Sequence, residues 1–318
     1  MAYYMYIGID LGGTNLKSSL FSSDFDWLDT VILASEANKG ADQVMDNIYQ
    51  SIALLLDHAG AAAKDIVSIG IGVPGLLDRK TGVALFSPNF KDWKDVPVAR
   101  LVEERFNIPT VIDNDVRVNL YGEWHFGAGR NKDNVVLITL GTGVGSGVVV
   151  DGHVLYGKTD SAGEIGHMNM YRKGRPCPCG SSGCLSRYVS ATGILLTAQE
   201  KRADYPKSIL ANEKNLTTQM ISEAYDQKDA FAQAIYRETG EILGFGLSNV
   251  INIYNPEILI IGGGVSKAGE RLLSHTREIV AQHSLQISHK ACEIVTANLS
   301  DKAGMIGAAY DGAMRVCR

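Results

Sequence analysis

Three short apolar segments of this chain each run directly into a glycine turn, and this repeated feature limits the folds that the sequence can adopt. After the first two turns the chain continues as a second extended segment, so each reads as a strand, a turn and a returning strand. Helical patterns separate these units, and the alternation of strands and helices predicts an α/β fold. The apolar segments are 3–9, 135–140 and 258–261, the returning strands are 16–21 and 146–150, and the turns are Gly12-Gly13-Thr14, Gly141-Thr142-Gly143 and Gly262-Gly263-Gly264.

The segments between the turns carry clear helix and strand patterns. Apolar residues at helical spacing predict a helix over 41–59 that ends at Gly60, and a buried strand follows over 66–73. With 318 residues, of which 45% are hydrophobic, the chain is expected to form two domains, with hinges near residues 112 and 300. Further helices are expected over 97–106, 116–126, most of 217–254 and 302–314, and a further strand over 109–112.

The charge balance argues against two classes of partner. Thirty Lys and Arg against 35 Asp and Glu give a net charge of −5, so a surface built for nucleic acid or for anionic lipid is not expected. The N-terminal apolar run has no basic region before it and meets Asp10, and no later segment is long and apolar enough to span a membrane. We therefore expect a cytoplasmic protein.

The glycine turns have the composition of phosphate-binding loops. In the first, glycines let backbone amides approach a phosphate, a threonine adds a hydroxyl donor, and Asp10 at a strand end could orient Mg²⁺ through water. The second turn could hold another phosphate, and the third could admit a flat base against the backbone. A single Gly-Gly turn is as often purely structural, but three such turns favour a ligand. The candidate nucleotide-binding residues are Asp10, Gly12, Gly13, Thr14, Asn15, Lys17, Gly141, Thr142, Gly143, Gly262, Gly263 and Gly264.

Two other glycine patterns match nucleotide-binding motifs in sequence, but they lack the helix that each motif requires. Residues 70–75 fit the dinucleotide pattern, but Pro74 and the residues after it do not open a helix. Residues 152–159 satisfy the P-loop pattern, yet Asp151-Gly152 is typical of a hairpin turn and no convincing helix begins after Thr159. Neither segment is expected to bind phosphate.

Three cysteines lie close together in a segment rich in proline and glycine. Cys177, Cys179 and Cys184, with His167 upstream, form a Cys3His set of the kind that holds a structural zinc ion in a closed tetrahedral shell. Such a shell leaves no open position for a water molecule, so the metal would shape the loop rather than perform chemistry. The alternative is three free thiols in a loop.

Several polar residues could converge on a sugar. Carboxylates and amides can hydrogen-bond several hydroxyls in a fixed geometry. Taken singly, each is a common cap or turn residue, and Asn114-Asp115 could simply begin a helix. The candidates are Gly75, Asn89 with Trp93, Asn114, Asp115, Glu164 and His167.

Taken together, these motifs resemble the ROK family of sugar kinases and related repressors, in the actin-like ATPase superfamily. The matching parts occur in order along nearly the whole chain. The cysteine loop with its preceding Gly166-His167 is the most specific of them. The others are Asp10 to Lys17, Gly72-Val73-Pro74-Gly75, Asn114-Asp115, residues 141–145, residues 162–167 and Gly262-Gly263-Gly264.

The resemblance implies a hinged, two-lobed and homodimeric enzyme that phosphorylates a hexose. Residues 1–112 with a C-terminal helix over 301–318 would form the smaller lobe, and 113–300 the larger lobe with the zinc loop and the dimer surface. Asp115 would be the general base that accepts the sugar proton during transfer from Mg-ATP, and His167 would bind zinc and touch the sugar. ATP, Mg²⁺ and a structural Zn²⁺ are thus the implied cofactors.

Two departures from the family pattern bear on the substrate. Family glucokinases usually carry Cys-Leu-Glu after the zinc loop, whereas Ser186 stands here in place of the glutamate. The loss of charge and volume could admit a β-glucoside or favour another hexose, such as fructose, allose or an N-acetylhexosamine. Arg117 also follows Asn114-Asp115 where the family usually has a small-residue run, and the sequence assigns it no role.

Two functions without turnover compete with the kinase interpretation. Family repressors carry a helix-turn-helix before the phosphate motif, whereas nine residues precede Asp10, which disfavours a sugar-sensing repressor. A zinc-stabilised binding module is disfavoured because Asp10, Asp115 and all three glycine turns are intact.

Overall fold

The computed structural model describes residues 4–317, and its chain forms two compact units. The first unit comprises the chain up to Asn131, Tyr156–Ala162 and the part from Asn298 onward, and the second comprises Lys132–Leu155 and Gly163–Ala297. Tyr3, in the first expected strand, and Arg318, in the expected C-terminal helix, lie outside the described residues. No helix within residues 4–317 is long and apolar enough to cross a membrane.

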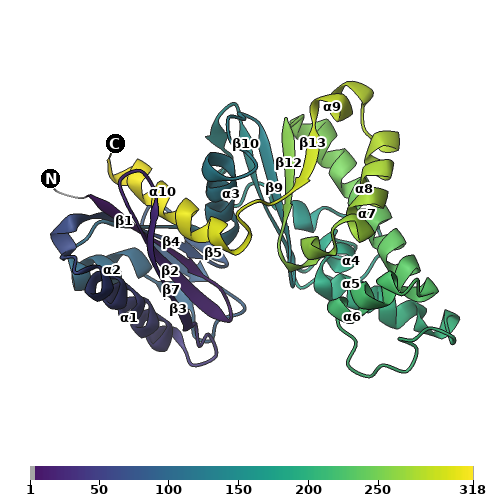
Figure 1. The fold of residues 1–318 in the computed structure, drawn as a ribbon, viewed down its shortest axis with the longest axis horizontal. Coiled ribbons are helices and arrows are strands. Elements are labelled where there is room, and N and C mark those ends of the chain that lie inside the picture. Colours follow the sequence, from purple (N-terminus) through teal and green to yellow (C-terminus); the bar gives the residue numbers. More distant parts are fainter. Residues whose placement is uncertain (1–3, 318) are drawn as a thin grey trace. The chain divides into compact units, whose positions relative to one another are not determined.

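A five-stranded sheet in the order β3-β2-β1-β4-β8 organises the first unit. The strands β1, β2 and β3 form an antiparallel meander, whereas β1, β4 and β8 run parallel (Figure 1). The carboxyl ends of these parallel strands therefore meet at one edge of the sheet. The bounds are β1 Met5–Leu11, β2 Asn15–Phe21, β3 Trp27–Ala34, β4 Ile66–Val73 and β8 Thr110–Asn114.

Helices cover both faces of this sheet, but through different kinds of contact. Isoleucines, leucines and valines of one face pack with α1 (Ala41–Ala59) and α2 (Val98–Phe106). On the other face Gly8 and Gly70 carry no side chain, and the C-terminal helix α10 (Ala303–Val316) lies directly against them. A Cβ atom at Gly70 would lie 1.8 Å from the carbonyl oxygen of Ala308.

The helix α3 (Asp115–Phe126) follows β8 and packs on α10. This packing places residues 113–131 in the first unit, so the boundary lies at Asn131 rather than near residue 112. The other return to this unit is at Asn298, close to the expected hinge near 300. A small antiparallel sheet completes the unit, with strands β5 Leu76–Asp78, β6 Val83–Phe86 and β7 Lys94–Val96.

The second unit repeats the pattern of hairpin and parallel strands. Its sheet has the order β11-β10-β9-β12-β13, with β9, β10 and β11 antiparallel and β9, β12 and β13 parallel. The strands are β9 Val135–Leu140, β10 Val144–Val150, β11 His153–Val154, β12 Ile258–Gly262 and β13 Glu293–Thr296, and the helices are α4 Ser186–Val189, α5 Ala191–Lys201, α6 Thr218–Asp226, α7 Ala230–Tyr254, α8 Glu270–His283 and α9 Gln286–Ala291.

The two misleading glycine patterns have structural explanations. Gly72 faces α3, where a Cβ atom would lie 2.4 Å from a methyl group of Val118, so this position needs glycine for packing. Gly152 lies in the turn between β10 and β11, and a non-helical turn, not a helix, follows Thr159.

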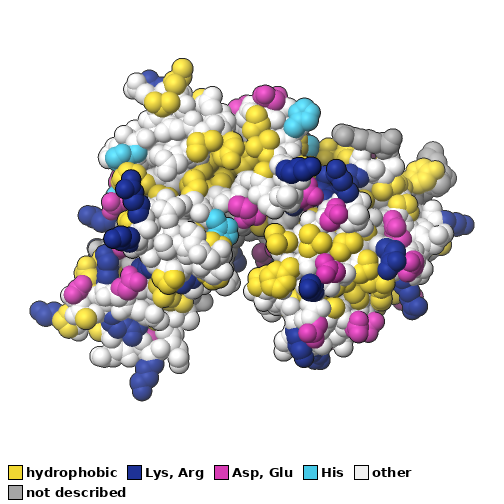
Figure 2. All heavy atoms as spheres, turned by 180° about the vertical axis from the view of Figure 1, so that it is seen from behind, with side chains coloured by type: hydrophobic (Ala, Val, Ile, Leu, Met, Phe, Trp, Pro, Cys, Tyr) yellow, Lys and Arg dark blue, Asp and Glu magenta, His cyan; other side chains and the backbone are white. Residues whose placement is uncertain are grey.

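On the face shown in Figure 2, basic and acidic side chains are interspersed without a continuous basic patch.

Candidate active site

Acidic side chains gather at one edge of the first unit's sheet. Asp10 lies near the end of β1 opposite Lys17 of β2, and Lys17 forms an ion pair with Asp301 at 3.7 Å between Nζ and Oδ2. The carboxylate of Asp10 packs against Gly304, where a Cβ atom would come within 2.4 Å of Oδ2. Burial raises the pKa of Asp10 to about 7, and the nearby carboxylate of Asp115 adds to the rise. A cation would relieve this electrostatic cost, so these residues fit a bound Mg²⁺.

Three of the turn glycines leave open space at the sheet edges. A Cβ atom at Gly13, Gly141 or Gly264 would meet nothing within 4 Å, so packing does not require glycine at these positions. Open backbone is what a phosphate or a base needs in order to approach closely. Gly263 differs, because its φ of +83° and the carbonyl oxygen of Leu140 at 2.5 Å from a built Cβ atom give it a structural role.

The junction between β8 and α3 presents Asn114 and Asp115. Asn114 is the N-cap of α3, and its side-chain oxygen accepts a hydrogen bond from the Val116 N–H at 3.0 Å. The same side chain donates to the carbonyl oxygen of Gly75 at 3.4 Å, which links it to the loop after β4. Asp115 is the first residue of α3. Asn89 is exposed in the turn after β6.

In the second unit, a short turn holds Glu164 and His167 at the surface. The turn η2 (Ile165–His167) packs on β10, because Gly166 lies against the carbonyl oxygen of Val144 and the Ile165 N–H donates to Ser146 Oγ at 3.0 Å. Both Glu164 and His167 are exposed and available to a ligand.

Ser186 lies beside the second glycine turn. It begins α4, and its hydroxyl oxygen accepts a hydrogen bond from the Val144 N–H at 3.2 Å. The oxygen also lies 3.7 Å from where a Cβ atom of Gly143 would be. The hydroxyl proton remains able to donate to a ligand at this turn.

His167 and the three cysteines form a compact cluster that fits a zinc ion. One potential ligand atom from each of the four residues lies within 4.8 Å of the others. Cys177 Sγ is 3.8 Å from His167 Nδ1, and Cys179 Sγ is 3.7 Å from Cys184 Sγ. The sulfur of Cys179 accepts a hydrogen bond from the backbone N–H of Ser181, which lowers the pKa of Cys179 to about 7 and favours the metal-binding thiolate. Burial instead raises the pKa of Cys184 to about 12, a cost that a bound cation would offset.

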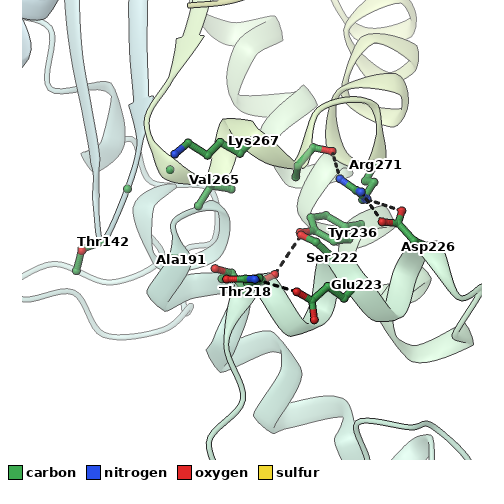
Figure 3. Close-up of a pocket in the computed structure, with 14 residues that line it drawn as sticks. Thr142, Ala191, Thr218, Ser222, Glu223, Asp226, Tyr236, Val265, Lys267 and Arg271 are labelled. Atoms are coloured by element: carbon green, nitrogen blue, oxygen red, sulfur yellow. Dashed lines mark hydrogen bonds and ion pairs between the residues drawn. The ribbon is translucent and has the colours of Figure 1, made fainter. Parts of the chain in front are cut away.

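The second unit also contains a pocket of about 620 Å³, whose lining includes the predicted residues Gly141, Thr142 and Gly264 and also helix side chains that the sequence did not indicate. Gly141, Thr142 and Gly264 form one part of its wall, and side chains of α6 and α8 form another (Figure 3). Arg271 and Asp226 form a bidentate ion pair in this wall, at 2.7 Å and 2.5 Å. In Figure 3, Lys267 extends away from Arg271, toward the side on which Thr142 lies. The volume suits a nucleoside.

The structure divides the candidate residues between the two units. Within each unit they come from segments far apart in the sequence. The first unit holds Asp10, Gly12, Gly13, Thr14, Asn15, Lys17, Gly75, Asn89, Asn114 and Asp115, and the second holds Gly141, Thr142, Gly143, Glu164, His167, Cys177, Cys179, Cys184, Ser186, Gly262, Gly263 and Gly264.

Comparisons with known proteins cover almost the whole chain. The sequence profile of the ROK family matches residues 6–311. A glucokinase from Halalkalibacterium halodurans is 35% identical over 96% of this chain and 94% of its own. A xylose repressor from Caldicellulosiruptor bescii is 30% identical over 95% of this chain and 76% of its own. The crystal structure of a ROK family glucokinase from Streptomyces griseus, in complex with glucose and AMPPNP, is 31% identical, with a TM-score of 0.80 over 98% of this chain and 99% of that one.

Proposed function

Because the chain belongs to the ROK family, we propose that it is an ATP-dependent sugar kinase that phosphorylates the 6-hydroxyl of glucose or of a glucose-like hexose. The observation that carries the proposal is that Asp115 begins α3 close to the carboxylate of Asp10, whose pKa it helps to raise. The similarity to glucokinases over nearly the whole chain supports the same reaction.

In the proposed reaction, Asp115 is the general base. Its carboxylate accepts the proton of the sugar hydroxyl while that oxygen forms a bond to the γ-phosphorus, and the bond from the γ-phosphorus to the bridging oxygen breaks to release ADP. The proposed sugar-binding residues are Gly75, Asn89 and Asn114 in the first unit and Glu164, His167 and Ser186 in the second. When bound near Asp10, Mg²⁺ supplies charge neutralisation for the phosphate oxygens.

The pocket beside Gly264 is the proposed site of the nucleoside. The proposed phosphate-binding groups are the backbone amides of two glycine turns, the first one and the one at Gly141. Thr14, Asn15 and Lys17 are proposed to assist the first turn. The Cys3His cluster would hold a structural zinc ion that fixes η2, and with it Glu164 and His167. The chain would act as a homodimer.

A sugar-sensing regulator is the second candidate, because a xylose repressor matches 95% of this chain. Turnover separates the two functions. The first experiment is coupled ADP release with Mg-ATP across glucose, mannose, fructose, allose, N-acetylated hexosamines and cellobiose. We expect turnover with at least one sugar, whereas sugar binding without turnover would favour the regulator.

The matched blank for this assay is Asp115→Asn. The substitution keeps the shape of the side chain but removes the proton acceptor, so we expect phosphoryl transfer to fall at least about 1,000-fold and sugar affinity to change less than about tenfold. Equal turnover by this variant would contradict the assignment of the base. Preference for glucose would mean that Ser186 tolerates the usual substrate, and preference for another sugar would make Ser186 the candidate determinant of specificity.

The nucleoside pocket is tested with Gly264→Val. Gly264 lines the pocket, and a Cβ atom there meets nothing within 4 Å, so the protein can accept the added side chain. We therefore expect the KM for ATP to rise at least about tenfold with little change in the KM for sugar. The control is Ala281→Val at an exposed position of α8 that does not line the pocket. An unchanged KM for ATP in the folded variant would place the nucleoside elsewhere.

A further inference from the structure

A group of buried charged residues lies next to the β8–α3 junction, and the proposed reaction does not use it. Asp113 is 1% exposed and Arg117 is 5% exposed, although both are of types that rarely lie in a protein interior. We define the buried charge cluster as the buried residues Asp113, Arg117 and Asp311 together with their half-buried partners Arg79 and Tyr156.

Asp113 is the centre of the buried charge cluster and accepts four hydrogen bonds. Arg117 Nε donates to Oδ1 at 2.6 Å, and Arg79 Nε and the Tyr156 hydroxyl donate to Oδ2 at 3.0 Å and 2.8 Å. The N–H of Asn114 donates to Oδ1 at 2.7 Å. A buried carboxylate with this many charge-assisted partners has little freedom to move, so it fixes the backbone immediately before Asn114 and Asp115.

Arg117 occupies an unusual position for a basic residue. It lies in the first turn of α3, where the helix dipole disfavours a positive charge, and the adjacent Asp113 offsets this cost. Arg117 also reaches a second segment, because Nη1 donates to the carbonyl oxygen of Asp160 at 2.7 Å. The planar guanidinium group, whose donors form a fork, therefore binds Asp113 and Asp160 at once.

The segment reached by Arg117, residues 156–162, is a short excursion of the chain into the first unit, and we call it the strap. The chain before and after the strap belongs to the second unit. The Arg79 guanidinium lies over the ring of Tyr156, 3.9 Å from its centroid. The backbone N–H of Arg79 donates a hydrogen bond to Asp160 Oδ2 at 3.4 Å. Asp311 in turn accepts a hydrogen bond from Arg79 at 3.4 Å. The strap ends two residues before Glu164.

We propose that Arg117, acting through Asp113, is a positioning residue that holds the general base Asp115 in place and fastens the strap to the same junction. This inference rests on the proposed kinase function. It also gives a role to the departure from the family pattern at residue 117. A lysine there could pair with Asp113 or with Asp160, but its single ammonium group would not reproduce the fork.

The first test compares Arg117→Met and Arg117→Lys with the unaltered protein on its best sugar. Methionine can fill much of the volume without charge, and lysine keeps the charge if methionine prevents folding. We expect kcat to fall about 10–100-fold in Arg117→Met, and less in Arg117→Lys, while the KM for sugar changes less than about threefold. The control is Arg100→Met, because Arg100 and Glu104 form an exposed ion pair with the same spacing on α2.

A second measurement separates positioning from general loss of stability. Tyr156→Phe removes one hydrogen bond to Asp113 from the strap and leaves the ring under Arg79. If both residues act through Asp113, the double variant will lose little more kcat than the worse single variant, at a temperature well below the unfolding midpoint of each. If the two residues act independently, the fold-losses in kcat of the two single variants will multiply in the double variant.

The outcomes are distinct. Unchanged kcat in folded Arg117→Met or Arg117→Lys would overturn the inference, as would multiplicative losses in the double variant. Absence of turnover by the unaltered protein on the whole panel would overturn the proposed function, and this inference with it.

Discussion

The position of Asp10 makes ionisation of its side chain costly to the fold. Its carboxyl group is held at the end of a buried strand beside Asp115 and Gly304, where ionisation is costly. Because its pKa is raised to about 7, the folded protein holds a proton on Asp10 between about pH 4 and pH 7, whereas the unfolded chain does not. This group therefore makes the fold less stable as the pH rises through that range.

The prediction at this scale concerns Asp10→Asn. The amide does not ionise, so we expect the variant to gain stability over the unaltered protein, by about 1–2 kcal/mol more at pH 8 than at pH 5. Phosphoryl transfer should fall at the same time. Urea unfolding at both pH values in EDTA measures the first effect, with Asp24→Asn in an exposed turn as the control. A gain that does not depend on pH would contradict the raised pKa.

Residues with distinctive chemistry could be predicted from the sequence. The Cys3His set has few other uses, and the structure brings its four side chains together as expected. The glycine turns of the pocket beside Gly264 were named from the sequence, but its helix wall could not be predicted, because that wall uses ordinary residues such as Thr218, Ser222 and Asp226. These three residues share only their four-residue spacing along α6, and the same spacing occurs on any surface helix, so it does not indicate a pocket.

At the scale of elements, the loop that carries the three clustered cysteines is connected to η2. His167 closes the Cys3His cluster and also ends η2, directly after Gly166 packs on β10. Removing a ligand should therefore displace Glu164 and His167 without unfolding the sheet.

We predict that Cys179→Ser, or removal of the metal by a chelator, weakens sugar binding about tenfold or more while the helix content stays within error. Calorimetric titration of the preferred sugar and circular dichroism check the two parts. The matched control is Cys292→Ser, because Cys292 lies outside the cluster. Unchanged sugar affinity in protein shown to be free of zinc would make the metal incidental.

Elements with strong periodicity were predicted closely. The helix over 41–59 and the strand over 66–73 have the expected bounds, and Gly60 ends the helix in the left-handed conformation. The strand β3 was missed because it lies at the sheet edge with Leu28 and Ile32 exposed, which blurs the alternation. The three strands of the small sheet are only three or four residues long, too short for a periodic signal.

At the scale of the whole molecule, the first unit is assembled from three separate parts of the chain. Strand β4 and helix α10 meet where glycines let two backbones touch, although well over a hundred residues separate them in sequence. Sequence reasoning placed the C-terminal helix with the first lobe, but it assigned α3 to the other because no linker marks the boundary.

Gly70→Val tests this contact. The added side chain would meet the backbone of Ala308, so α10 could not dock, and we expect a loss of more than about 3 kcal/mol in the free energy of unfolding. Urea unfolding followed by circular dichroism measures it. Gly13→Val is the control, since a Cβ atom there meets nothing within 4 Å. Equal stability of the two variants would show that α10 does not depend on this close approach.

The late position of α10 also orders the events of biosynthesis. While the ribosome is still adding the second unit, the glycine-lined face of β1 and β4 has no helix to cover it, for about ten seconds or longer at usual rates of translation. The second unit, whose last strand β13 precedes α10, can fold first. The nascent first unit therefore waits with one face of its sheet uncovered, and chaperones that hold such chains should bind it until α10 leaves the exit tunnel.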